Sequence, residues 1–196
     1  MTPVHSPPAA HKYLPTLEDK LTTPSGDSGW LCVFYNNDVD GKPITSKEIA
    51  RFTLQDTRVK LNDFLPPGLS KEWTIHLSGK LTLDRTAPFE LGLTVAGRAK
   101  LYVDGKMTID NWTHQRPGEF FYGQGSMEEK AVVQITKGTS VEVLVEYINS
   151  SPPDAGDKDL AQPALMLGVV RILFLRAASS FFLTRHFSEA RRGRED

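Results

Sequence analysis

Short apolar runs separated by turn-forming residues make up most of the chain from Trp30 onward, and this pattern limits what it can fold into. No stretch carries the apolar period of about 3.6 residues that an amphipathic helix requires. Instead, about ten runs have the length and residue content of strands, which predicts an all-β fold, an antiparallel β-sandwich or a barrel. The predicted strands are residues 31–35, 51–54, 73–83, 89–95, 99–103, 107–109, 119–122, 131–135, 141–147 and 164–170.

The segment from Val141 to Tyr147 gives the clearest strand signal. Its apolar side chains occur at every second position, with Glu142 and Glu146 between them. This alternation is typical of a strand with one face in a core and the other in solvent. Turn-forming residues precede it at 136–139, so the sequence predicts a hairpin with the strand at 131–135.

A second hairpin is predicted around the Asp-Gly pair at 104–105. A three-residue loop there would pair Val103 with Met107 and Leu101 with Ile109. We favour this register over a two-residue loop because it keeps the apolar side chains on one face of the hairpin.

The composition excludes several classes of protein. Hydrophobic residues make up 39% and charged residues 24% of the chain, which is unlike collagen, wholly disordered chains or polytopic membrane proteins. A formal net charge of −1 argues against a nucleic-acid-binding protein. The single cysteine, Cys32, excludes an internal disulfide and zinc sites built from cysteine pairs. It lies in an apolar run, where we expect a small core residue rather than a nucleophile.

The sequence divides into three parts. Residues 1–27 hold five prolines and are predicted to be a mostly irregular leader, and residues 28–171 form the β-sandwich. Residues 172–196 form an arginine-rich tail that we expect to be disordered or non-native. The start lacks the apolar region of a signal peptide, and Arg171 and Arg176 interrupt the apolar stretch at 165–183. We therefore expect no signal peptide and no transmembrane helix, with the cytoplasm as the default location.

Four motifs, in the right order, resemble the PA14 module, the β-sandwich named after anthrax protective antigen. They are WLCVFY at 30–35, GKL at 79–81, LYVDGK at 101–106 with DNW at 110–112, and the late VEY at 145–147. The likeness covers roughly residues 28–171. It implies an antiparallel β-sandwich of the PA14 type.

Three further segments are similar to the PA14 module inserted in fungal β-glucosidases of glycoside hydrolase family 3. They read YLPTLEDK at 13–20, VAGRAK at 95–100 and PGEFFYGQG at 117–125. In that family the module interrupts an α/β domain and leans over the mouth of the active site. The resemblance implies that residues 1–27 are a remnant of the host domain. It also implies that the aspartate nucleophile and the glutamate acid/base lie on other domains, so no catalytic residue is expected in this chain.

Other relatives of the module, the yeast adhesins, bind sugar through calcium held by two adjacent aspartates. The corresponding loop here is 95–98, where Val95 and Ala96 stand in place of the aspartates. Apolar side chains supply no oxygen ligand for calcium. We therefore expect no calcium site of that type, and no other metal or cofactor.

An aromatic cluster marks the candidate binding site: Trp112, Phe120, Phe121 and Tyr122, with His114 among them. Flat side chains with a polar edge suit the apolar C–H faces of sugar rings. The prolines and glycines around the cluster indicate a loop, where binding residues concentrate. We predict that these five residues contact carbohydrate. The alternative is that Trp112 and one of the phenylalanines belong to the core.

The other polar residues give no catalytic pattern. Asp104 and Asp110 flank the predicted hairpin, and the glutamate pairs at 128–129 and at 142 and 146 are expected on exposed faces. The five histidines have no ligand spacing. A glycosylation triplet begins at Asn111, and we expect it to be unmodified because no secretion signal is present.

These observations predict a non-catalytic module that contacts carbohydrate and shapes substrate access in a family 3 β-glucosidase. The parent enzyme would hydrolyse terminal non-reducing β-D-glucosyl residues. The expected partners are a β-glucoside or short oligosaccharide and the remaining domains of the parent enzyme, with no nucleic acid and no membrane. The alternative is a stand-alone, calcium-independent sugar-binding or interaction module.

Overall fold

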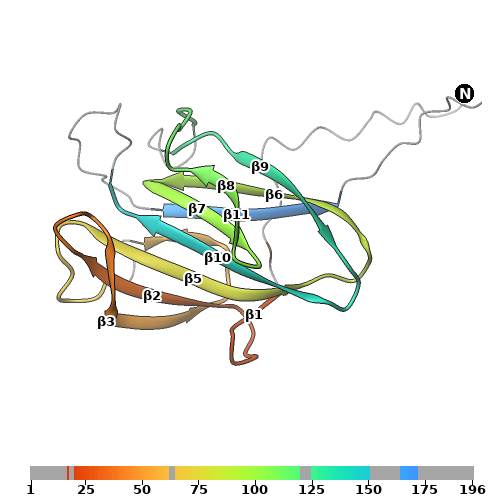
Figure 1. Ribbon diagram of the computed structural model, residues 1–196, viewed down its shortest axis with the longest axis horizontal. Helices are drawn as coiled ribbons and strands as arrows, with labels where there is room; N and C mark the ends of the chain where they lie inside the picture. Colours follow the sequence, from red (N-terminus) through yellow and green to blue (C-terminus); the bar gives the residue numbers. More distant parts are fainter. Residues whose placement is uncertain (1–16, 18–19, 62–64, 120–124, 151–163, 172–196) are drawn as a thin grey trace, which may run out of the picture.

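The computed structural model describes residues 17, 20–61, 65–119, 125–150 and 164–171, with only the backbone described for 168–171. Their strands form two antiparallel sheets that pack face to face (Figure 1). One sheet has seven strands in the order β3-β2-β5-β10-β7-β8, with β1 pairing with β5, and the other has four in the order β4-β11-β6-β9. The strands are β1 (Leu21–Thr22), β2 (Trp30–Asn37), β3 (Pro43–Leu54), β4 (Arg58–Lys60), β5 (Trp73–Thr82), β6 (Ala87–Ala96), β7 (Arg98–Val103), β8 (Lys106–Asn111), β9 (Glu129–Ile135), β10 (Ser140–Ile148) and β11 (Ala164–Arg171). The predicted all-β, antiparallel sandwich is confirmed.

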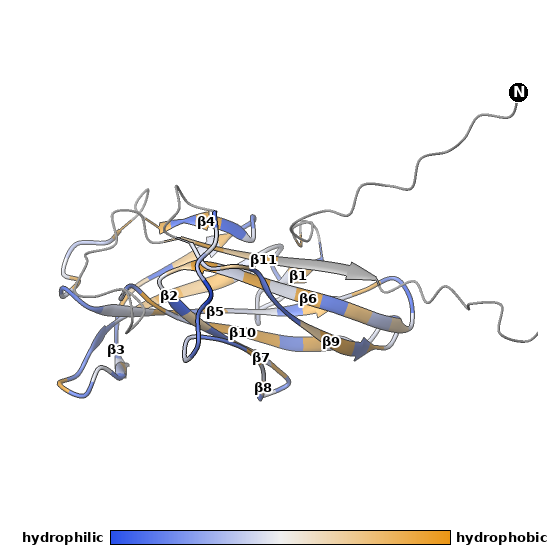
Figure 2. Cartoon of the chain, turned by 90° about the horizontal axis from the view of Figure 1, so that it is seen from above, coloured by the Kyte–Doolittle hydropathy of each residue, from blue (hydrophilic) through white to orange (hydrophobic). Residues whose placement is uncertain are grey.

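The core lies between the sheets and is built by alternation along each strand. In β10, Val141, Val143, Val145 and Tyr147 are buried, while Glu142 lies on the opposite, exposed face. Hydrophobic and hydrophilic bands alternate along the strands (Figure 2). Because side chains of a strand point to opposite faces in turn, each sheet supplies one apolar face to a common core.

Residues before position 28 also contribute to the sandwich. Strand β1 pairs with the end of β5, with Leu21 opposite Leu81. Leu17 and Leu21 are buried in the main core. Leu17 and strand β1 therefore pack as part of the sandwich.

The strand prediction missed β1, β4 and the first two thirds of β3, residues 43–50, which are mostly exposed. Such edge segments lack the apolar alternation that marks a half-buried strand. The predicted strand at 119–122 falls largely outside the described residues.

The predicted hairpin between 131–135 and 141–147 is wrong. Strand β9 belongs to the four-stranded sheet and β10 to the seven-stranded sheet, so the turn between them crosses the sandwich. The turn is tied to the connection between β5 and β6, since Lys137 N donates to Thr86 Oγ1 at 2.9 Å and Gly138 N to Leu83 O at 3.4 Å. The connection between β5 and β6 also passes from one sheet to the other. The two connections that cross the sandwich are therefore hydrogen-bonded to each other.

The predicted hairpin of β7 and β8 is present at the expected position, but its register differs from the predicted one. Its turn has two residues, Asp104 and Gly105, both with positive φ (48° and 74°), as in a type I′ turn. Val103 therefore pairs with Lys106, and the predicted pairing of Val103 with Met107 is wrong. A bulge after Leu101 then restores the predicted pairing with Ile109. The bulge thus keeps the apolar face inward despite the shorter turn.

Candidate functional site

The site is built at the end of β8, where Asp110 fixes a turn. Its Oδ1 accepts hydrogen bonds from the backbone N–H groups of Trp112 and Thr113, both at 2.9 Å. Its Oδ2 accepts one from Thr113 Oγ1 at 2.7 Å. Partial burial acts to raise the pKa of Asp110, but these hydrogen bonds and the charge of Lys100 outweigh it and lower the pKa. Asp110 is thus an ionised capping residue that locks the turn carrying Trp112.

Trp112 is half-buried and lies outside the hydrophobic core. Arg98 Cζ lies 5.3 Å and Lys100 Nζ 5.0 Å from the centre of its ring. Cations at these distances are attracted to the electron-rich ring face. The interpretation of Trp112 as a core residue is therefore wrong, and its ring is held at the surface of β7.

Arg98 is itself restrained. Its guanidinium donates from Nε to Ser150 Oγ at 2.9 Å, with a second hydrogen bond from Nη2 to the same oxygen. Burial lowers the pKa of Arg98, with Glu72 acting in the opposite direction. A cation that is fixed and partly desolvated gives Trp112 a rigid neighbour.

His114 is exposed on the same turn, two residues after Trp112. The turn thus presents a half-exposed indole and an exposed imidazole together. The other predicted contact residues, Phe120, Phe121 and Tyr122, lie outside the described residues.

The two chain segments that flank 120–124 are hydrogen-bonded to each other. Gly118 N donates to Gly125 O at 2.8 Å, and Met127 N to Arg116 O at 2.7 Å. A Cβ atom on Gly118 would lie 2.3 Å from the carbonyl oxygen of Ser126, so only glycine fits this position. We call the two segments, residues 116–119 and 125–127, the stem.

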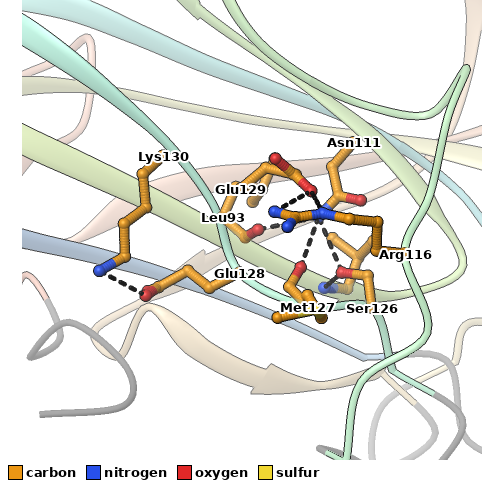
Figure 3. A network of polar contacts seen from close by, with 9 residues as sticks. Leu93, Asn111, Arg116, Ser126, Met127, Glu128, Glu129 and Lys130 are labelled. Atoms are coloured by element: carbon orange, nitrogen blue, oxygen red, sulfur yellow. Dashed lines mark hydrogen bonds and ion pairs between the residues drawn. The ribbon is translucent and has the colours of Figure 1, made fainter.

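Asn111 anchors the stem to the sheets. It is fully buried, and its Nδ2 donates to Leu93 O at 2.8 Å, to Ser126 Oγ at 2.7 Å and to Met127 O at 3.4 Å (Figure 3). Ser126 in turn bonds to β6, since its N–H donates to Val95 O at 2.7 Å and its Oγ accepts from Val95 N at 3.2 Å. The sequence marked Asn111 as part of the DNW motif and as a glycosylation acceptor, but did not predict this anchoring role. Asn111 Nδ2 is thus enclosed by partners, whereas its buried Oδ1 has no hydrogen-bond partner among the described residues.

Ion pairs involve the residues that directly follow the stem, 128–130. Arg116 Nη2 lies 2.9 Å from Glu129 Oε1, and Lys130 Nζ lies 3.4 Å from Glu128 Oε2 (Figure 3). The expectation that Glu128 is exposed is wrong, because its side chain is 3% exposed. The carboxylate lies over Gly92, where an added Cβ would come within 2.4 Å of it. The missing side chain at Gly92 creates the space that buries Glu128, and this spatial fact is invisible in the sequence.

The loop at 95–98 is closed by protein hydrogen bonds. Ala96 O accepts from the Tyr147 hydroxyl at 2.5 Å, and Gly97 O accepts from Gln115 Nε2 at 2.7 Å. The side chains of Val95 and Ala96 are fully buried and apolar. Burial raises the pKa of Tyr147 well above its ordinary value, so it remains a neutral donor. Within the part of the chain that the structure describes, no group of three or more His, Cys, Asp or Glu side chains is arranged to hold a metal ion.

Cys32 and His76 lie away from the Trp112 turn. Cys32 is confirmed as a core residue, and its burial raises the pKa of the thiol to about 12. His76 is partly buried on the outer face of β5, and burial lowers its pKa while Glu146 acts in the opposite direction. In the described ranges, the structure contains no helix of the length and apolar character needed to span a membrane.

Comparison with known proteins identifies the family of the chain. The PA14 domain family matches residues 35–161. A probable β-glucosidase K of Emericella nidulans is 34% identical over 143 residues, which is 71% of this chain and 16% of that protein. A β-glucosidase from Kluyveromyces marxianus, solved in complex with glucose, superposes with a TM-score of 0.71 at 23% identity, over 83% of this chain and 20% of that one. The PA14 sugar-binding domain of an RTX adhesin shares the fold with a TM-score of 0.50 at 13% identity, covering 74% of this chain and 90% of that one.

The chain therefore spans about a sixth of the length of the fungal β-glucosidases that it matches. The order of motifs, the two-sheet sandwich and the family match agree with one another. This chain belongs to the PA14 domain family.

Proposed function

We propose that the chain is a non-catalytic, carbohydrate-contacting module that shapes substrate access in a family 3 β-glucosidase. The parent enzyme would hydrolyse terminal non-reducing β-D-glucosyl residues with catalytic groups from its other domains. The observation that carries this proposal is Trp112, a half-exposed indole on a locked turn beside two cations.

The physical argument for sugar contact is the chemistry of that turn. An indole offers an apolar face for the C–H groups of a pyranose and an N–H at its edge for a hydroxyl. Lys100 and His114 add polar groups close by. Because Asp110 fixes the turn before any ligand arrives, little conformational entropy is lost on binding.

A second observation supports a role within a larger enzyme. Leu17 N donates to Thr57 Oγ1 at 3.0 Å, and Thr57 Oγ1 donates to Leu167 O at 2.7 Å. Leu17 and the middle of β11 (Ala164–Arg171) are therefore held beside the same buried hydroxyl. Proximity between the N-terminal and C-terminal parts of a domain is what its insertion into a host requires.

The proposed mechanism is geometric. Residues 119–125, together with Trp112 and His114, would line one side of a cleft whose other side belongs to the host domains. Such a wall narrows the cleft, which favours short β-glucosides over long chains. Because half of that site is missing from this chain, the chain alone should bind glucosides weakly.

The experiment is a titration of the isotope-labelled chain with glucose and cellobiose, followed by the amide signals in NMR spectra. Millimolar affinity is expected, consistent with a free energy of roughly −4 kcal/mol, with shifts concentrated at 110–116 and unchanged by EDTA. Trp112→Ala should abolish the shifts, whereas Trp112→Phe should retain part of the effect. Binding at micromolar concentrations that survives EDTA would favour the stand-alone module instead. No shift at 110–116 up to the solubility of the sugars would contradict both.

A further inference from the structure

The outer face of the seven-stranded sheet contains a trough away from the Trp112 turn. It has a volume of about 340 Å³ and crosses β5, β10 and β7. Pro24, from the β1–β2 connection, and Gly105, from the β7–β8 turn, wall it at either end. We call this feature the trough, and its side chains are Ser78, Lys80, Tyr102, Glu142 and Leu144.

The strand register explains why the face is hollow here. Leu144 of β10 lies between Ser78 of β5 and Tyr102 of β7. The small Ser78 side chain leaves depth between its larger neighbours, and Leu144 gives the trough an apolar floor. In the next row, Lys80 pairs across the strands with Glu142.

The polar side chains of the trough make no ion pair or hydrogen bond with other described residues. Lys80 and Glu142 are neighbours in register, yet neither side chain forms an ion pair or hydrogen bond with another described residue. The same holds for the hydroxyls of Ser78 and Tyr102 within the described ranges. The trough therefore offers an ammonium donor, a carboxylate acceptor and two hydroxyls around an apolar floor.

This set of groups selects the kind of ligand. One positive and one negative charge favour a neutral molecule over an ion of either sign. Several donors and acceptors beside an apolar floor and a phenol ring suit a polyhydroxylated ligand with an apolar face. A volume near 340 Å³ lies within the range of small-molecule sites.

The trough lies along the same strand face as Trp112. Arg98, Lys100 and Tyr102 alternate along β7, and the first two contact the Trp112 ring. Tyr102 follows Lys100 by two residues, or about 6.6 Å along a strand. A ligand that begins at Trp112 and runs along β7 therefore reaches the trough directly.

We infer that the trough is a second carbohydrate subsite, which holds the more distant units of a short β-linked oligosaccharide whose first unit contacts Trp112. Tyr102 and Leu144 contact the sugar faces, while Lys80 and Glu142 bind hydroxyls. This inference rests on the proposed sugar-contacting function, and it adds that the module distinguishes oligosaccharides from monosaccharides.

The test compares the affinity of the chain for glucose and for a β-1,4-linked glucose tetramer, measured by NMR titration. The unmodified chain should bind the tetramer more tightly than glucose, with shifts at 78–80, 102 and 142–144 only for the tetramer. Tyr102→Ala should weaken tetramer binding about three- to tenfold and leave glucose binding unchanged, because only the tetramer reaches the ring. Glu142→Gln, which preserves size and removes the charge, should weaken tetramer binding about threefold.

Tyr35→Ala is the matched control, because Tyr35 is a half-buried aromatic residue on the same face of the sheet but outside the trough. It should change neither affinity, and thermal unfolding checks that each variant is folded. Equal affinity of the unmodified chain and Tyr102→Ala for the tetramer overturns the inference while leaving the Trp112 contact intact. Shifts in the trough without shifts at 110–116 overturn the proposed function at Trp112 but support the subsite. Absence of any binding overturns both.

Discussion

At the scale of single residues, Gly97 and Tyr147 show how closely the end of the sandwich beside the site is packed. Gly97 has a φ of +129°, and an added Cβ would lie 2.5–2.6 Å from the Tyr147 side chain. The Tyr147 hydroxyl uses this close approach to reach Ala96 O. The sequence reveals a glycine at this position, but not the tyrosine, 50 residues later, that requires it.

Gly97→Ala should lower the free energy of unfolding by about 3 kcal/mol, because it adds backbone strain and a collision with a buried ring. Gly105→Ala is the control, since Gly105 also has positive φ but has nothing within 4 Å of the added Cβ. It should cost only about 1–2 kcal/mol. Urea unfolding measures both, and equal losses would show that the contact with Tyr147 is unimportant.

His76 should make stability depend on pH. Its burial lowers the pKa below the ordinary value of about 6.5, so the unfolded chain binds a proton more readily than the folded one. Stability due to neutral His76 is therefore full above the unfolded pKa and falls as the pH drops toward the folded pKa. Urea unfolding between pH 8 and 5 should show a shallower decline for His76→Gln than for the unmodified chain. An identical decline would contradict this account.

At the scale of elements, the sequence predicted strands better than their partners. Strand β10 was predicted correctly because its two faces differ in polarity. That β9 and β10 lie in different sheets depends on the turn between them, which is hydrogen-bonded to Thr86 and Leu83 in the β5–β6 connection. The candidate site shows the same contrast. Trp112 was proposed from the chemistry of its side chain, but the structural role of Asn111 and Ser126 was missed. Their role arises from contacts with β6 that no local pattern encodes.

Asn111→Ala should loosen the stem. The substitution removes the donor shared by Leu93 O, Ser126 Oγ and Met127 O, so the three hydrogen bonds that join β8 to β6 and the stem are lost. A loss of about 2–3 kcal/mol is expected, with faster amide hydrogen exchange at Ser126. Asn36→Ala, which removes hydrogen bonds at an exposed position, is the control and should cost less than about 1 kcal/mol. Unchanged exchange at Ser126 in Asn111→Ala would show that Asn111 does not hold the stem.

At the scale of the whole molecule, Thr57 links the N-terminal part of the described chain to the last strand, β11. Its buried hydroxyl bridges Leu17 and Leu167, residues 150 positions apart. Thr57→Val preserves the shape and leaves both backbone groups without this partner, so a loss of about 2–3 kcal/mol in the free energy of unfolding is expected. Thr53→Val, at an exposed position of β3, should change stability by less than about 0.5 kcal/mol. Equal effects in urea unfolding would contradict the bridging role.

The most direct test of sugar contact uses the three tryptophans. Trp30 and Trp73 are 0% and 3% exposed, so quenching of fluorescence by acrylamide reports mainly on the half-exposed Trp112. Trp112→Phe should remove most of the quenchable signal and serves as the control. If the account is right, saturating cellobiose protects the signal of the unmodified chain from acrylamide, with or without EDTA. Quenching that is identical with and without cellobiose would contradict the claim that Trp112 contacts carbohydrate.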